Sequence, residues 1–243
     1  MTFNILSTFD LTSLTQGYPL WMKRKSHVFE MIRAKDPDLI SIQEASSSQL
    51  DQFQAEFSQQ YRFAHNRAFT PDSFVMYKSS RFDLIEKGYW ALEAPLDLKI
   101  RRLAVWVKLR DKNSSRELMF VGTHLDAKKI KMGELKLIKE KLRVHHGSGA
   151  PLFLAGDFNS DRNDPVYAEL TSAGWKDSYL GPLDESETKT FPYLNPTRRI
   201  DHIVFFGEGM ETTEWEALLA AEGITPSDHR PVFASFKILE ALF

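Results

Sequence analysis

The sequence predicts an α/β fold built on mixed β-sheets. Segments with the apolar runs of strands outnumber the segments with helical periodicity, and helices separate only some of the strands. This order favours sheets with both parallel and antiparallel pairs over purely parallel ones. The chain has 243 residues, of which 42% are hydrophobic, enough for a sizeable core. We therefore expect a single domain over residues 1–243.

The strand-like segments are apolar runs bounded by turn residues. In chain order they cover residues 2–6, 39–43, 73–78, 81–92, 101–109, 117–123, 151–155, 203–206 and 231–236.

Two helices are expected in the first quarter of the chain. The first runs from Trp21 to Lys35, and Pro37 limits it because the residue before a proline disfavours helix. Its apolar face consists of Trp21, Val28, Met31 and Ile32. The second covers residues 46–60, with serines at its start as N-caps. Its apolar stripe consists of Leu50, Phe53 and Phe57.

Two further helices are expected later. One covers residues 129–145, and its many lysines lie opposite the apolar face, which is typical of a solvated surface. Its inward residues are Ile130, Leu135, Ile138 and Leu142. A short helix begins at Asp164–Pro165, with an acidic cap and a proline at its first position. We expect Gly174 to end it.

Composition limits the function classes. With 31 basic and 33 acidic residues the formal net charge is -2, which argues against a strongly basic nucleic-acid binder. The chain has no cysteine, so disulfides and thiolate metal sites are excluded. No apolar stretch is long enough to span a membrane. Because the first strand begins at Thr2, we expect no signal peptide and a cytoplasmic location. We also expect a monomer.

Residues 151–161, PLFLAGDFNSD, are the most informative stretch. An apolar run reads as a buried strand, and Gly156 then releases the chain before Asp157 and Asn159. A carboxylate can accept a proton from water or bind a cation, and an amide can donate hydrogen bonds to an oxyanion. Alone, this stretch is equally consistent with a strand followed by a polar turn.

The same pattern of an apolar strand with polar side chains at its end recurs along the chain. The ends of neighbouring strands meet at one rim of a sheet, so such side chains can converge although they lie far apart in sequence. The polar residues in question are Asn4, Glu44, His124, Asp126, Asp201, Asp228 and His229.

Six motifs along the chain resemble those of the endonuclease/exonuclease/phosphatase superfamily, which includes deoxyribonucleases, abasic-site endonucleases, inositol-polyphosphate phosphatases, sphingomyelinases and deadenylases. In chain order they are TFNIL, PDLISIQEA, THLDA, GDFNSD, RRIDHIVF and SDHRPVFASF, and they extend from residue 2 to residue 236. The resemblance implies a four-layer α/β/β/α sandwich of two mixed sheets flanked by helices, with the active site at one edge.

The resemblance also implies a divalent metal ion. The family's matching glutamate, Glu44 here, binds the metal, and Asp228 and Asn4 can add further oxygen ligands. An all-oxygen site without thiolate favours Mg²⁺ or Mn²⁺ over Zn²⁺.

The catalytic roles follow from the same resemblance. Asp157 is the candidate for orienting or deprotonating the attacking water, and Asn159 for donating to a phosphate oxygen. Asp201 pairs with His229 and fixes its tautomer, although Asp201 is equally suited to bind the metal. His229 either activates water or stabilises the transition state. His124 faces the phosphate.

Two residues at the rim are weaker candidates for substrate binding. Asp72 lies where some nucleases of the family carry an acid that pairs with the histidine matching His124. Arg102 can bind phosphate bidentately, but it can equally be a solvated charge at a strand end.

These residues predict a metal-dependent phosphoesterase that uses in-line water attack. Balanced charge and the lack of a basic arm favour a small or non-polymeric phosphoester as substrate. A nuclease acting on DNA or RNA is the alternative, because loops set specificity in such enzymes. A more remote alternative is a non-catalytic binding module that keeps the fold.

Overall fold

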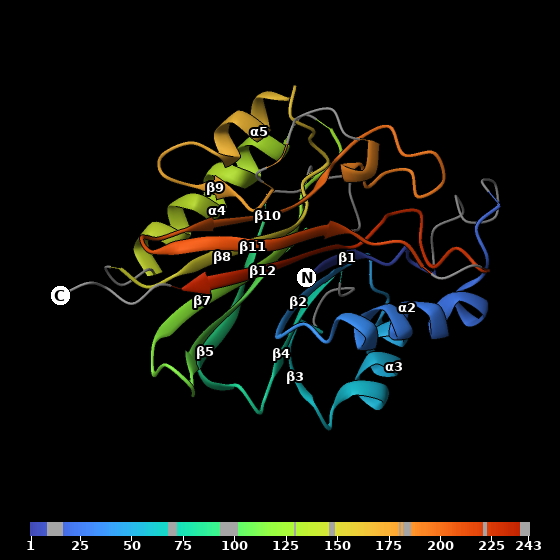
Figure 1. Ribbon diagram of the computed structural model, residues 1–243, viewed down its shortest axis with the longest axis horizontal. Helices are drawn as coiled ribbons and strands as arrows, with labels where there is room; N and C mark the ends of the chain where they lie inside the picture. The colour runs from blue at the N-terminus through green and yellow to red at the C-terminus, as the bar shows by residue number, and fades with distance from the viewer. Residues whose placement is uncertain are drawn as a thin grey trace.

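The computed structural model describes residues 1–8, 17–67, 72–92, 102–128, 130–145, 149–179, 181, 186–220 and 223–238. Within this part of the chain, two six-stranded sheets pack face to face, and helices cover their outer faces (Figure 1). The predicted four-layer sandwich of mixed sheets is confirmed.

The first sheet has a parallel pair at its centre, β1–β2, and its other pairs are antiparallel. In spatial order its strands are β11 (Met210–Ala217), β12 (Val232–Ile238), β1 (Thr2–Asn4), β2 (Leu39–Gln43), β4 (Ser73–Lys78) and β3 (Tyr61–Ala64). Helices α2 (Trp21–Lys35) and α3 (Ser47–Phe57) pack on it, as the buried cluster of Phe29 and Phe53 with Phe3 and Ile40 shows.

The second sheet also contains one parallel pair, β7–β8. In spatial order its strands are β5 (Phe82–Ala91), β6 (Leu103–Asp111), β7 (Glu117–His124), β8 (Leu152–Asp157), β10 (Asp201–Phe206) and β9 (Lys176–Asp177). Helices α4 (Lys131–His145) and α5 (Pro165–Leu170) lie on its outer face (Figure 1). A short 3-10 helix, η1, covers Ser186–Thr188.

The inner faces of the two sheets form a third apolar layer, which includes Val75, Val105, Phe120 and Ile203. At one point the sheets are joined by a hydrogen bond, which the Ser41 hydroxyl donates to the Ala155 carbonyl over 3.1 Å. This close packing brings the end of β1 against the end of β8.

The first predicted helix is confirmed with its bounds, whereas two others end earlier than expected. The α3 helix begins with a capping box in which Ser46 and Gln49 bind each other's backbone N–H groups, and it ends at Phe57, not at residue 60. The α5 helix starts at Pro165 as predicted but ends at Leu170, well before Gly174. The Thr171 and Ser172 hydroxyls donate to carbonyls of its last turn and so end it. Residue 129, the predicted start of the lysine-rich helix, lies outside the described residues.

Among the strands in the described ranges, three were not predicted. They are β3, β9 and β11. The longest of them, β11, is an edge strand rich in threonine and glutamate, with mostly half-buried or exposed residues, so it lacks an apolar run.

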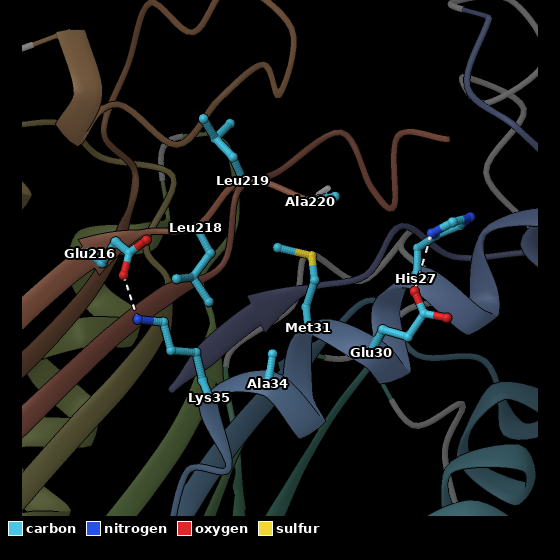
Figure 2. A pocket seen from close by; sticks show the side chains of 9 residues that line it. All are labelled: His27, Glu30, Met31, Ala34, Lys35, Glu216, Leu218, Leu219 and Ala220. Atoms are coloured by element: carbon cyan, nitrogen blue, oxygen red, sulfur yellow. Dashed lines mark hydrogen bonds and ion pairs between the residues drawn. The ribbon is translucent and has the colours of Figure 1, made fainter. Parts of the chain in front are cut away.

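A hollow of about 210 Å³ lies between α2 and the segment after β11 (Figure 2). Its lining is largely apolar, with Met31, Leu218 and Leu219 among the nine residues, and it shares none of the site residues predicted above. None of the helices in the described ranges has the length and hydropathy of a membrane span.

Candidate active site

Strand register lines up three of the predicted residues. His124 ends β7 and pairs with Asp157, which ends β8, while Asp157 in turn pairs with Asp201, the first residue of β10. Residues directly opposite each other on neighbouring strands point to the same face of a sheet. Pairing of the three strand ends therefore brings one imidazole and two carboxylates side by side.

Gly156 has a different role from the one predicted. It does not release the chain, because β8 continues to Asp157. A β-carbon at this position would lie 2.0 Å from the Thr123 carbonyl oxygen of β7. Glycine is therefore required at this point of the β7–β8 pairing, one residue before the paired His124 and Asp157.

Asp157 lies at the centre of the site and is buried. Its Oδ2 lies 3.4 Å from Nε2 of His124 and 3.8 Å from Nε2 of His229, while Oδ1 accepts a 2.8 Å bond from the Asn159 backbone N–H. Burial favours the neutral acid. The charges of the two histidines, with the hydrogen bonds from the Asn159 backbone and the Asn4 side chain, outweigh this effect and lower the pKa of Asp157. Asp157 is thus an ionised carboxylate at neutral pH.

His229 and Asp201 form the predicted pair. Nδ1 of His229 lies 2.9 Å from Oδ2 of Asp201, and both side chains are buried. Burial alone lowers the pKa of an imidazole, but the charges of Asp201 and Asp157 raise the pKa of His229 well above its ordinary value. The ring is therefore held as an imidazolium, with Nε2 directed toward Asp157.

Two residues that hold this pair were not predicted. The Thr190 hydroxyl accepts hydrogen bonds from the backbone N–H groups of Ile200 and Asp201, at 3.1 and 3.3 Å, and fixes the start of β10. The Phe191 ring packs on the His229 ring with their centroids 4.7 Å apart. The segment that contains both residues, TFPYLNPT, has no periodicity from which these roles could be predicted.

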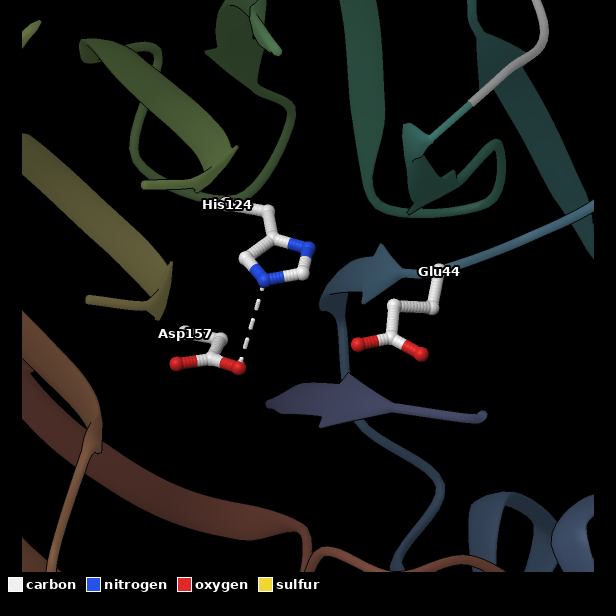
Figure 3. A group of neighbouring side chains, drawn as sticks. All are labelled: Glu44, His124 and Asp157. Atoms are coloured by element: carbon white, nitrogen blue, oxygen red, sulfur yellow. Dashed lines mark ion pairs between the residues drawn. The ribbon is translucent and has the colours of Figure 1, made fainter. Parts of the chain in front are cut away.

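The other sheet contributes Asn4 and Glu44. Asn4, at the end of β1, donates through Nδ2 to Oε1 of Glu44 and to Oδ2 of Asp157, both over 3.0 Å. Glu44 follows β2 with a φ of 58°, a left-handed conformation that is costly for a residue with a side chain. Figure 3 shows the carboxylate of Glu44 directed toward the space beside His124 and Asp157.

The donor set fits a divalent cation. Ligating atoms of Glu44, His124 and Asp157 lie within 4.8 Å of one another, and a second such group consists of Asp157, Asp201 and His229. Asp228 belongs to neither group, but burial, together with the negative charge of Glu44, raises its pKa to about 6. Carboxylates that disfavour each other's ionisation are stabilised by a cation between them. Asn4 presents its amide nitrogen to the acids, and a half-turn of the amide would present its oxygen.

His124 forms a second cluster with the two rim residues. Its Nδ1 lies 2.5 Å from Nη1 of Arg102 and 3.4 Å from Oδ2 of Asp72, and Arg102 donates to Asp72 over 2.6 Å. Burial opposes ionisation of Asp72, but Arg102 and His124 outweigh it and lower its pKa. The structure thus places Arg102 and Asp72 in contact with the site rather than in solvent.

Asn159 adopts a left-handed conformation with a φ of 50°, which asparagine tolerates better than most residues. Its Nδ2 donates to the Leu125 carbonyl over 2.9 Å and lies 3.3 Å from Nε2 of His124. The amide nitrogen has two N–H donors, so it can bind the Leu125 carbonyl and face His124 at the same time.

Comparisons with known proteins agree with this geometry. Residues 1–229 match the model of the endonuclease/exonuclease/phosphatase family. Nocturnin of Rattus norvegicus is 26% identical over 90% of this chain, which spans 59% of that protein.

Two solved structures share the fold. A mannosyl-6-phosphatase of Bacteroides thetaiotaomicron has a TM-score of 0.81 and 24% identity, over 97% of this chain and 98% of that one. The catalytic domain of human nocturnin with bound sulfate has a TM-score of 0.79 and 22% identity, over 98% and 92%.

The matched region contains each strand end that contributes to the site, together with Asp228 and His229. The members of this family are hydrolytic enzymes that depend on a divalent metal ion. The chain therefore belongs to the endonuclease/exonuclease/phosphatase family.

Proposed function

We propose that this protein hydrolyses a small or non-polymeric phosphoester by in-line attack of water, with Mg²⁺ or Mn²⁺ as its metal. The observation that carries the proposal is the position of Asp157, whose Oδ2 lies within 3.8 Å of both histidine rings. Asp201 pairs with His229 on one side of Asp157, and the carboxylate of Glu44 faces the same space.

Glu44 and Asp228, with Asn4, are the residues proposed to hold the metal. A bound divalent cation would polarise the phosphoryl group and offset the negative charge of the transition state. The carboxylates supply hard oxygen ligands, which match the preference of Mg²⁺ and Mn²⁺.

Asp157 is proposed to orient the attacking water. A carboxylate whose pKa is lowered is a weak base at neutral pH, so positioning the water by hydrogen bonding fits better than full deprotonation. Asn4 and the Asn159 backbone fix this carboxylate, since they occupy Oδ2 and Oδ1 respectively.

His229, as an imidazolium held by Asp201, is proposed to donate from Nε2 to the phosphoryl group as negative charge develops on it. The raised pKa of His229 supports this role over that of a base that takes a proton from water. His124 and the side-chain amide of Asn159 are proposed to donate to the remaining phosphoryl oxygens.

The charges at the rim support a small substrate. Three cations near the site are paired with acids: Arg102 with Asp72 at 2.6 Å, Lys131 with Asp164 at 2.5 Å, and Arg198 with Asp161 at 3.3 Å. Pairing reduces the positive potential that a polyanion needs for binding. Arg230, which follows His229, lines a hollow of about 410 Å³ that has room for a small polar leaving group.

The experiment compares kcat/KM on small phosphomonoesters and phosphodiesters with kcat/KM on plasmid DNA, in Mg²⁺ and at several salt concentrations. We expect efficient turnover of a small ester, weak cleavage of DNA and a shallow salt slope, because few phosphates are contacted. Asp157→Asn serves as the inactive control for both substrates. Efficient, strongly salt-dependent cleavage of DNA with negligible turnover of small esters would establish the nuclease alternative instead.

A further inference from the structure

An arginine lies buried beneath the residues proposed to hold the metal. Arg24, in the first turn of α2, is 1% exposed. Arginine is almost never fully buried unless its donors are satisfied, because removing a guanidinium from water is costly. Its contacts therefore indicate what the side chain does.

All the hydrogen bonds that the Arg24 side chain donates within the described residues go to backbone carbonyls. Nη1 donates to Ile5 and, over 2.9 Å, to Pro226; Nη2 donates to Leu6; and Nε donates over 3.1 Å to Pro19. The guanidinium also stacks on the Trp21 ring, 5.1 Å from its centroid.

Three of these four carbonyls belong to the two segments that carry proposed metal ligands, whereas Pro19 precedes α2. Ile5 and Leu6 directly follow Asn4, and Pro226 lies two residues before Asp228. Nη1 alone binds one carbonyl of each segment. The guanidinium is a rigid planar fork, so it fixes the separation of the segments in a way that a flexible side chain does not.

A second contact joins the same two segments. The Ser227 hydroxyl donates to the Asn4 carbonyl over 2.6 Å. The segments that present Asn4 and Asp228 are thus held at two points, and one of these is the buried guanidinium.

We propose that Arg24 is a positioning residue that sets the separation of Asn4 and Asp228 and thereby the affinity of the site for a divalent cation. The inference rests on the proposed function only in that these two residues belong to the metal site. If the guanidinium acted only through its positive charge, its removal would have the opposite effect. A cation beneath the site repels the metal, so loss of the guanidinium charge would tighten metal binding.

The test measures the dissociation constant of Mn²⁺ by electron paramagnetic resonance on the full chain, for Arg24→Lys and for Arg33→Lys as control. Lysine keeps the charge but cannot reach carbonyls on both segments with a planar fork. Arg33 lies on the same helix, is half exposed and pairs with Glu56. We expect Mn²⁺ to bind at least tenfold more weakly to Arg24→Lys and unchanged to Arg33→Lys.

A folded Arg24→Lys protein with unchanged or tighter Mn²⁺ binding overturns the inference. Should Arg24→Lys fail to fold, Ser227→Ala tests the same separation by removing the other contact. We expect several-fold weaker Mn²⁺ binding for Ser227→Ala, and unchanged binding overturns the inference. Absence of Mn²⁺ binding by the wild-type chain contradicts the proposed metal site itself, which separates the two failures.

Discussion

The paired His229 and Asp201 side chains are the clearest functional unit at the scale of single residues. The carboxylate fixes the ring through Nδ1 at 2.9 Å and keeps it protonated, so that Nε2 faces Asp157 as a donor. An imidazole without this partner loses both its orientation and the charge that stabilises its protonated form.

We expect His229→Ala and Asp201→Ala each to lower kcat by about 10²–10⁴-fold, the range for a positioned acid or base. The double variant should lose little more than either single variant, because residues that act as one unit are strongly non-additive. The measurement is kcat at saturating substrate and metal for the wild type, both single variants and the double variant. Losses that multiply fully would show that the two residues work independently.

Glu134, on α4, is a buried acid next to the site that the proposed chemistry does not use. Its Oε2 accepts a 2.7 Å hydrogen bond from the Asp126 backbone N–H, which holds the turn after His124. Burial raises the pKa of Glu134 from 4.5 to about 7. The folded chain therefore binds this proton more tightly than the unfolded chain does.

This shift predicts a specific pH dependence of stability. The contribution of the protonated Glu134 is fully present below pH 4.5 and is lost as the pH rises through about 7, because only the folded state retains the proton in that window. In the wild type, the free energy of unfolding should therefore fall by at most about 2–3 kcal/mol between pH 5 and 8. The Glu134→Gln variant should not show this fall. Urea unfolding of both proteins across this range measures the difference. If the free energy of unfolding changed equally with pH in both proteins, the raised pKa of Glu134 would be contradicted.

At the scale of elements, the site depends on the register of β7, β8 and β10. The sequence predicted polar residues at one end of each of these strands, because an apolar run bordered by a polar residue is a local pattern. Which residue of one strand lies opposite which residue of the next depends on long-range pairing, and a shift of one residue would turn each side chain to the other face. The pairing of His124 with Asp157 and of Asp157 with Asp201 therefore became visible only in the structure.

Gly156→Ala tests the register directly. The added β-carbon would meet the Thr123 carbonyl at 2.0 Å, and a backbone atom cannot move aside cheaply. We expect a loss of about 1–3 kcal/mol in the free energy of unfolding, the usual cost of overpacking. We also expect a lower kcat, since His124 and Asp157 follow the displaced residues.

The matched control is Gly133→Ala on α4, where a β-carbon would meet nothing within 4 Å. This variant should be stabilised by about 0.5–1 kcal/mol through helix propensity, with kcat unchanged. Thermal unfolding and steady-state kinetics of both variants give the comparison. Equal effects of the two substitutions would show that the close contact between β7 and β8 at Gly156 does not require glycine.

At the scale of the whole molecule, the site forms where the edges of two sheets meet. Asn4 ends one strand and Glu44 follows another strand of the first sheet, whereas His124, Asp157 and Asp201 belong to the second sheet. The motifs and their order predicted these residues and the sandwich through resemblance to a family. The supporting residues were out of reach: Arg24 looks like a helix surface charge in sequence, and Thr190 lies in a segment without periodicity.

The dependence of activity on a divalent metal tests the central claim most directly. The substrate is a phosphoester that the wild-type protein hydrolyses in Mg²⁺. Initial rates are measured in Mg²⁺, after exhaustive treatment with EDTA, and after Mg²⁺ or Mn²⁺ is added back. The wild type and Glu44→Gln are compared under each condition. With hard oxygen ligands at the site, we predict that chelation abolishes turnover, that either ion restores it, and that Glu44→Gln needs far more metal. Undiminished turnover after exhaustive chelation would contradict the account.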